Sequence, residues 1–576
     1  MKNFIKIGNF FKNNFFIYIA TLSFLIIAHF PVLTGDFLRQ DDWNATFWSY
    51  GGYFFHPFGH PEFWNATVEL FRPIGYLILF ISDYICLEIE NAKFVRFFTI
   101  ILISFASYIT YTWQVKFLPN NKFFSFCFSV ISFCLIASQL HTSTAGYNGM
   151  VITLIFGQIA FIYFFKALVE VRDNILKRRY IILSGLLIIM GCMNYAITLM
   201  QYFLFLFIFY ISNIDKQTYS KKQIYEFIIK SVIFIISIMI IYILMAKFFH
   251  FILNVQDKIH ASGTIRSIHI NWDITNKIYN ILNMLKYSFN IFGVWSSQGI
   301  NSINIFFTGI SLTFIFFFLS ILIKLNFTYE KNNNIKNHLN IFSNSLLIFF
   351  ISLILLILSY TPILPIEIKI YDDNPFKTVM PNRYFAVTMP FILYIIMWTI
   401  NTLFNFYFSN LHTTNLLSSY KHICKNLIFF CTLIFSIYKC NYTLENFVVR
   451  PHLTEINYIK KHIEKDILKI IESGGKPTII ILRNPDIMKV KPGNDFDLTI
   501  NYSHNWLISA TIYTLRQFNI NTILSYKVLK WRTDHGIHIT SDWGELASVN
   551  DINSLNLQTK KNAVIIDMNK LSITSK

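Results

Sequence analysis

The chain has 576 residues, of which 54% are hydrophobic and 18% aromatic but only 14% charged. This composition excludes a disordered chain, a fibrous repeat and an ordinary soluble enzyme, because it leaves little polar surface for water. The formal net charge of +18 does not indicate a nucleic-acid-binding protein, since the Lys and Arg residues separate apolar segments instead of clustering. We therefore expect a multi-pass membrane protein, and the abundance of Lys, Asn, Ile and Phe favours a bacterial source.

Apolar segments long enough to cross the roughly 30 Å hydrocarbon core of a bilayer recur through the first part of the chain. The first of them follows three lysines and lacks a small-residue cleavage site, so it is interpreted as a retained helix and not as a removed signal peptide. Their many aromatic side chains are interpreted as lipid-facing bulk. We expect eleven spans, near 14–33, 97–115, 123–140, 148–168, 181–195, 197–213, 229–250, 303–323, 342–360, 384–408 and 426–441.

Positive charge assigns a side to the loops, because short cytoplasmic loops are richer in Lys and Arg than external ones. Basic residues fall in alternate loops, namely Lys116 and Lys122; Lys177, Arg178 and Arg179; Lys216, Lys221 and Lys222; Lys324, Lys331 and Lys336; and Lys421 and Lys425. These loops and the amino terminus are expected on the cytoplasmic face of a bacterial inner membrane. The odd number of spans then places the region after about 442 on the periplasmic face, together with the loops 34–95 and 251–302.

The apolar stretch 73–89 does not fit this count, because a crossing there would place the basic loop at 177–179 outside. It also carries Asp83, Glu88 and Glu90, and carboxylates near the bilayer midplane are costly. We therefore expect an interfacial or re-entrant helix at this position.

The expected fold is an α-helical transmembrane domain over 1–441, whose first external loop covers about 34–95, followed by a small external α/β domain over 442–576. No glycine-rich phosphate motif opens any helix of the second region, so no nucleotide site is expected there. That region alternates helix-like segments with β-rich runs, namely 454–472, 504–518, Thr478–Leu482, Thr522–Tyr526 and Ala563–Asp567.

The chain has seven cysteines, and most of them lie within or beside apolar segments. No two form a C-x-x-C pair, and none follows Cys440. This pattern predicts neither a disulfide framework nor a zinc site.

The first external loop begins with Gly35-Asp36-Phe37-Leu38-Arg39-Gln40-Asp41-Asp42-Trp43, which places three carboxylates just after the first span. A partly desolvated carboxylate beside another carboxylate has a raised proton affinity and can act as general base toward a hydroxyl. Asp41 and Asp42 are therefore candidate catalytic residues. The competing interpretation is that these acids only mark a solvated loop.

The same loop continues to Phe71-Arg72-Pro73-Ile74-Gly75-Tyr76, where Arg-Pro opens an apolar helix. An early Asp-Asp-Trp followed some tens of residues later by Arg-Pro resembles the GT-C superfamily of integral membrane glycosyltransferases, such as those that use dolichyl-phosphate-mannose or transfer aminoarabinose. The resemblance extends to the eleven spans, the long first external loop and the external carboxy-terminal domain. The loop from Asp-Asp-Trp to Arg-Pro is its more specific part.

The resemblance implies a glycosyltransferase that takes a polyprenyl-phosphate-linked sugar and transfers it to a lipid-linked glycan, a lipid or a protein. Asp41 or Asp42 would be the family's catalytic base, and Asp42 is favoured because Asp41 could orient it or hold a cation. Asp36 matches the family pattern less well. Some family members use a divalent ion and others do not, and the adjacent carboxylates would suit Mg²⁺ or Mn²⁺ without requiring either.

A departing lipid phosphate needs positive charge, which a fixed guanidinium supplies through paired hydrogen bonds. Arg72 opens the interfacial helix, and Arg383 lies at the outer end of the tenth span. Arg383 is followed by Tyr384, in an Arg-Tyr pair that is similar to many family members. We expect both arginines to bind the donor phosphate. The alternative for Arg383 is a headgroup anchor, with Tyr384 in the aromatic belt.

Other polar residues near the outer ends of the spans are candidates for lining the same cavity. A lone Asn or His at a helix end is more often a cap or a satisfied turn residue than a ligand, so each is a weak candidate by itself. The candidates are Asp36, His60, His141, Tyr147, Asn194 and Tyr384.

Two other functions compete with the enzyme: a transporter or flippase of lipid-linked or anionic substrates, and a non-catalytic membrane assembly protein. Coupled transporters usually carry repeated halves and ionisable residues within their spans, and neither is evident in this sequence. Convergence of Asp42, Arg72 and Arg383 on one external cavity is required by an enzyme and by neither alternative.

Overall fold

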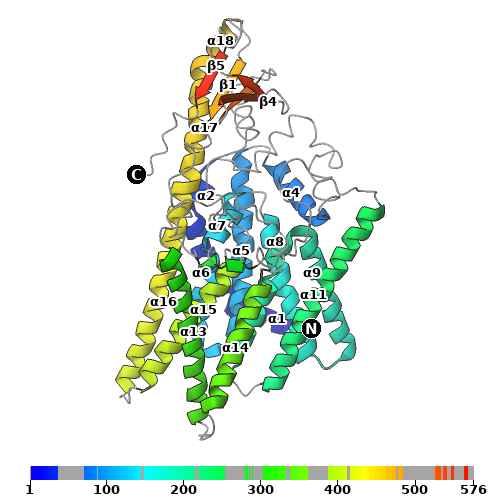
Figure 1. Cartoon of the computed structure of the whole chain (residues 1–576), viewed down its shortest axis with the longest axis vertical. Coiled ribbons are helices and arrows are strands. Elements are labelled where there is room, and N and C mark those ends of the chain that lie inside the picture. The colour runs from blue at the N-terminus through cyan, green and yellow to red at the C-terminus, as the bar shows by residue number, and fades with distance from the viewer. Residues whose placement is uncertain are drawn as a thin grey trace.

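The computed structural model describes residues 2–36, 71–86, 89–144, 148–214, 219–252, 303–331, 338–360, 387–410 and 415–474, together with five strands beyond 477 and single positions between 278 and 289. The segments up to 474 are almost entirely helical, and eight of their helices are long and apolar enough to cross a membrane. Figure 1 shows these helices side by side in one bundle. The chain is therefore an α-helical, multi-pass membrane protein.

Helices coincide with all eleven predicted spans. Three of the spans fall on shorter or bent elements: the part Phe15–His29 of α1 (Lys2–His29), the pair α6 (Lys122–Ile131) and α7 (Ile136–Ser143), which is bent by 53°, and α10 (Gln201–Ser212). Whether α1 and α10 cross a membrane stays a prediction. The eight long helices are α5 (Ala92–Phe117), α8 (Asn148–Phe165) with the π-helical turn after it, α9 (Asn174–Leu199), α11 (Lys221–Ile252), α13 (Ile303–Lys331), α14 (His338–Leu358), α15 (Thr388–Asn410) and α16 (Asn415–Leu444).

The turn between α9 and α10 lies part-way along the bundle and not at its surface. Gly157, in the middle of α8, packs so closely on this turn that an added Cβ would lie 2.3 Å from the carbonyl oxygen of Leu199. α10 begins directly after Met200 and is about 18 Å long at 1.5 Å per residue, which is shorter than the bilayer core. All 12 of its side chains are buried. This arrangement ends α9 inside the protein.

Loops that the charge pattern assigned to one side gather at one end of the bundle. Lys116, at the end of α5, pairs with Glu170, at the end of the π-helical turn Lys166–Glu170 that follows α8. Lys425 of α16 donates to the side-chain oxygen of Asn121, between α5 and α6, at 3.3 Å. We call this the Lys116 end. Which face of a membrane it meets stays a prediction.

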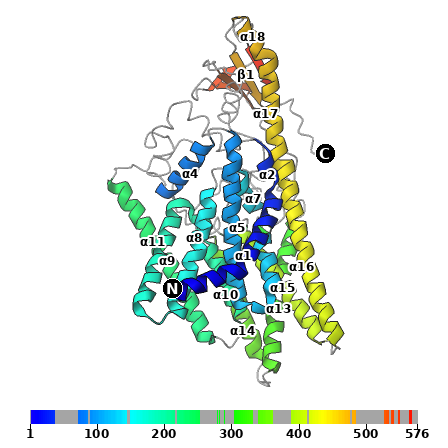
Figure 2. The ribbon, with the colours of Figure 1, turned by 180° about the vertical axis from the view of Figure 1, so that it is seen from behind.

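The opposite end, called here the α4 end, carries α2 (Pro31–Thr34) and α4 (Pro73–Ile85) (Figures 1 and 2). At about 20 Å, α4 is shorter than the bilayer core. Whether this segment lies at the membrane interface or re-enters the membrane stays a prediction. One face of α4 packs on α8 and α9. On another face Leu77, Ile81 and Tyr84 are exposed, at the spacing of a single helical stripe.

α16 continues without a break through α17 (Arg450–His462) to α18 (Leu468–Glu472), with π-helical turns between them. Figures 1 and 2 show this long helix leaving the bundle at the α4 end. Five strands follow in the chain and form one sheet in the order β4-β3-β2-β1-β5, in which β1 is parallel to β2 and β5, whereas β3 is antiparallel to β2 and β4. The strands are β1 (Thr478–Arg483), β2 (Tyr526–Arg532), β3 (Gly536–Thr540), β4 (Leu546–Val549) and β5 (Ala563–Asp567).

The predicted division into a transmembrane domain over 1–441 and an α/β domain over 442–576 finds no support in the described residues, because the helix runs straight through that boundary. The predicted helix 454–472 is part of this long helix, and the predicted helix 504–518 lies outside the described residues. A separate domain after residue 442 therefore stays a prediction.

The centre of the bundle is largely aromatic. Trp113 of α5 stacks on Phe205 of α10, with 5.8 Å between ring centroids and 7° between planes, and meets Phe161 and Phe165 of α8 edge-on. Its indole N–H donates to the Phe205 carbonyl at 3.1 Å. Stacked and edge-to-face geometries are the favourable ones for aromatic pairs. The interpretation of span aromatics as lipid-facing bulk is therefore wrong for these residues, which join three helices.

Replacing Gly157 with Ala should destabilise the bundle, because the new Cβ would meet the Leu199 carbonyl oxygen, a backbone atom that cannot rotate away. We expect a loss of about 1–3 kcal/mol, the usual range for overpacking, seen as a lower midpoint of thermal unfolding in detergent. Gly309→Ala in α13 is the matched control, because no described atom lies within 4 Å of its added Cβ. Equal midpoints for the two variants would contradict the close contact.

Candidate functional site

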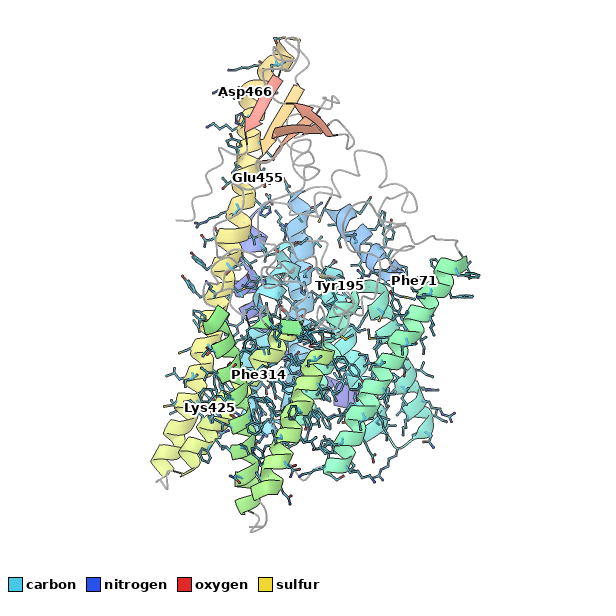
Figure 3. All side chains as sticks on the ribbon, in the orientation of Figure 1. Phe71, Tyr195, Phe314, Lys425, Glu455 and Asp466 are labelled. Carbon is cyan, nitrogen blue, oxygen red and sulfur yellow. The ribbon has the colours of Figure 1, made fainter. Side chains whose placement is uncertain are left out.

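The part of the predicted site that falls within the described residues lies at the α4 end, where the start of α4 packs against a kink in α9. At the kink, Tyr195 has φ −147° and ψ 84°, which are not helical values. Arg72, the residue just before α4, places its guanidinium carbon 5.5 Å from the centre of the Tyr195 ring. Figure 3 labels Tyr195 and the neighbouring Phe71 at this level of the bundle. The kink thus brings an aromatic face under an arginine.

Phe71 holds Arg72 in place through an uncommon backbone conformation. Its φ of 48° lies in the left-handed region, which bulky residues rarely adopt. The hydroxyl of Tyr242 in α11 donates to the Phe71 carbonyl at 3.0 Å, and the Phe71 ring contacts the rings of Tyr242 and Phe249. Because the left-handed conformation costs about 1–2 kcal/mol for such a residue, these contacts with α11 are what stabilise it.

Arg72 is a partly buried cation with no carboxylate partner among the described residues. Stacking on Tyr195 stabilises the charge and leaves the in-plane N–H donors of the guanidinium available. The first backbone N–H groups of α4 also lack partners within the helix, and Pro73 suits this first position because it has no N–H. A fixed guanidinium beside a helix N-terminus is an arrangement that binds anions, phosphate in particular.

Asn194 lies at the same junction, next to Tyr195. Its amide nitrogen donates to the Gly149 carbonyl of α8 at 2.7 Å. An added Cβ at Gly149 would lie 2.9 Å from the Asn194 side-chain oxygen, and one at Gly75 of α4 would lie 3.1 Å from the Asn194 carbonyl. The structure thus brings Asn194 close to Arg72, but the amide is buried and bonds to the bundle. Asn194 therefore fits the interpretation of a turn residue whose hydrogen bonds are satisfied within the protein better than that of a substrate ligand.

His141 belongs to another polar cluster, in α7. It is buried, and neither ring nitrogen has a hydrogen-bond partner among the described residues. The neighbouring His29 of α1 has Nε2 2.9 Å from the Phe133 carbonyl and Nδ1 2.8 Å from the Thr142 hydroxyl. Since a carbonyl only accepts, Nε2 carries the proton and Nδ1 accepts from Thr142. A cavity shared by His141 and Arg72 stays a prediction.

Asp36 is an exposed residue at the start of the first loop. One carboxylate oxygen lies 3.8 Å from the Lys93 ammonium at the start of α5, and the two side chains are 55% and 40% exposed. An exposed ion pair of this kind contributes about 0–1 kcal/mol. The position fits a solvated loop residue better than a desolvated base.

The remaining predicted site residues lie outside the described residues: Asp41, Asp42, His60, Tyr147, Arg383 and Tyr384. Their convergence with Arg72 therefore stays a prediction, as does the choice between the two aspartates. Within the described residues, no group of three or more His, Cys, Asp and Glu side chains could hold a metal ion. The predicted site for Mg²⁺ or Mn²⁺ at the two aspartates lies outside that range.

Arg96 was not predicted as a site residue; it directly precedes the predicted span at 97–115. The side chain of Arg96 is fully buried. Arg96 lies in α5 about one turn after Lys93, whose side chain pairs with Asp36 at the surface. Because a buried guanidinium in a membrane bundle is costly, it marks a functional or structural polar site. The sequence does contain a sign of this buried position, because polar residues recur along one face of α5 at helical spacing. They are Arg96, Thr99, Ser107, Thr110 and Gln114, and all are buried.

No family model matches this chain, and no curated protein or solved structure matches it either. The geometry around Arg72 and the motifs of the sequence are accordingly the grounds for a function.

Replacing Asn194 with Ala should lower the unfolding free energy by about 1–3 kcal/mol, because a buried hydrogen bond and the packing of the Asn194 side chain against α8 would both be lost. The midpoint of thermal unfolding in detergent measures this change. Asn446→Ala is the matched control, since the same amide group donates to the Tyr442 carbonyl at 2.9 Å in an exposed position. A larger loss at Asn446 than at Asn194 would show that Asn194 does not hold the junction.

Proposed function

We propose that this protein is a membrane glycosyltransferase, which transfers a sugar from a polyprenyl-phosphate donor to a hydroxyl group on a lipid-linked glycan, a lipid or a protein. The observation that carries the proposal is Arg72, a partly buried guanidinium held over Tyr195 at the N-terminus of α4, with no carboxylate partner among the described residues. The phosphate of the donor would supply the anion. The resemblance of the first loop to the GT-C superfamily supports the same assignment.

The outer face of α4 suits a donor with a hydrocarbon tail. Leu77, Ile81 and Tyr84 form an exposed apolar stripe that begins within two turns of Arg72. A polyprenyl chain lying in the membrane along this stripe would keep its hydrocarbon out of water while its phosphate reaches the guanidinium. The same helix would thus contact both parts of the donor.

In the proposed reaction, the acceptor hydroxyl oxygen attacks the anomeric carbon of the sugar. The bond from that carbon to the phosphate oxygen breaks in the same displacement, so the configuration inverts. Asp42, or Asp41 in its place, takes the hydroxyl proton as general base. The phosphate leaves with the bonding electron pair, and Arg72 and Arg383 stabilise its charge.

The proposal includes an orientation, with the α4 end on the periplasmic face of a bacterial inner membrane. Basic loops gather at the Lys116 end, as expected of a cytoplasmic side. Toward the α4 end of α16, the rings of Tyr438 and Tyr442 stack on each other, and Lys439 lies 5.5 Å from the Tyr442 ring centre. Aromatic and basic side chains of this kind are typical of the membrane–water boundary.

Replacing Asp42 with Asn should abolish transfer, because the amide cannot accept the hydroxyl proton. The measurement is transfer of radiolabelled sugar from a panel of polyprenyl-phosphate donors in membranes, for the wild type, each single variant and the Asp41→Asn/Asp42→Asn double variant. Asp173→Asn is the control, because Asp173 caps α9 near the Lys116 end through a bond from the Ile175 amide. Full transfer by the folded double variant would rule out the assignment of the base.

Replacing Arg72 with Gln should lower kcat/KM for the donor by about 10²-fold or more, the usual effect of removing one charge-stabilising donor group. Arg172→Gln should leave transfer unchanged, because Arg172 is an exposed arginine near the Lys116 end. Equal activity of the two variants would remove Arg72 from the mechanism. Donor binding that depends on Arg72, without transfer to any acceptor, would instead favour a flippase.

A further inference from the structure

Two cysteines that are far apart in the sequence meet inside the bundle. Cys134 lies at the break between α6 and α7, and Cys440 lies in the last part of α16. Both side chains are buried. The Cys440 thiol interacts with the thiol of Cys134 and with the side chain of Gln139. The sequence has no spacing that would reveal this contact, since no C-x-x-C pair is involved.

Hydrogen bonds on both sides hold the two thiols at this position. The His29 ring places Nε2 2.9 Å from the Phe133 carbonyl and 3.9 Å from the Cys440 sulfur, so one imidazole touches both chain segments. The Gln139 amide donates to the Cys134 carbonyl at 3.0 Å. These contacts fix the backbone around Cys134 at the place where a helix would otherwise be continuous.

α16 is fixed at the same level by a separate contact with α1. The side-chain amide of Asn441, the residue after Cys440, donates to the carbonyl of Ile27 at 3.1 Å. α16 packs against α1, α6 and α7.

We propose that Cys134 and Cys440 form a disulfide bond in the mature protein. In this step each cysteine loses its thiol hydrogen and a sulfur–sulfur bond forms. The two electrons and two protons pass to an oxidised dithiol–disulfide oxidoreductase, whose own disulfide is reduced to two thiols. The proposal rests on the orientation given above, because such bonds persist on the periplasmic side and not in the cytosol.

The bond forms during folding, as α16 packs against α6 and α7 and before the sulfur atoms are shielded. It would join the α6–α7 break to the helix that leads to α17 and α18. A cross-link between such distant residues removes many conformations from the unfolded chain, so it stabilises the folded state. It would also fix the depth of α16 relative to the break, which hydrogen bonds alone hold less firmly.

The test is a thiol map of the full-length protein, purified from membranes with N-ethylmaleimide present from lysis onward. After denaturation and digestion without reductant, mass spectrometry should find a linked peptide pair containing Cys134 and Cys440, two hydrogen masses below the sum of the free peptides. Both cysteines should react with a second alkylating reagent only after reduction. Reduction should also lower the midpoint of thermal unfolding by several degrees.

Cys440→Ser should remove the linked pair and leave Cys134 open to alkylation. Cys127→Ser is the matched control, because Cys127 is also buried in α6, and it should keep the linked pair. Alkylation of both Cys134 and Cys440 in the wild type without reduction, or a link from either one to another cysteine, would overturn the proposal. The wild-type map decides the matter even if a variant fails to fold, and it is independent of glycosyl transfer.

Discussion

The α4 end depends on one close contact, in which α4, α8 and α9 meet around Asn194. Gly75 and Gly149 leave the space that this residue occupies, and its amide bonds to the Gly149 carbonyl. With Asn194 bonded across to α8, the chain departs from helical geometry at Tyr195, and α9 ends a few residues later inside the bundle. The stack of Arg72 on Tyr195 follows from that departure. The site at the α4 end is thereby built from a local break in one helix.

Aromatic packing holds α10, the short helix that follows this break. In lipid the hydrophobic effect does not drive helices together, so association relies on shape, dispersion and hydrogen bonds between helices. The stack of Trp113 on Phe205 and its bond to the Phe205 carbonyl supply these between α5 and the short α10. α10 can be shorter than the bilayer core because protein surrounds it on all sides. Its aromatic residues contact neighbouring helices and not lipid.

The spans could be predicted because length and hydropathy are local properties, and the Arg-Pro motif likewise pointed to Arg72. The kink at Tyr195 and the turn beside Gly157 could not be predicted, since each depends on a contact between distant segments. The continuous helix beyond α16 contains Pro451, a residue type that normally breaks a helix. Here the π-helical turn Glu445–Val449 directly before it lengthens the hydrogen-bond spacing, so the proline is accommodated.

Among the described residues, the neighbour of Arg72 is an aromatic ring and not a carboxylate, which has a consequence for the chemistry of the guanidinium. A carboxylate would fix the guanidinium equally well, but it would neutralise the charge and occupy the donors that a phosphate needs. Tyr195 contacts one face of the guanidinium, and such a contact does not use the N–H donors in its plane. Because the group is also partly buried, its attraction for an anion is screened less than at an exposed site. Positional restraint and available charge are therefore combined in one residue, and both follow from the break in α9.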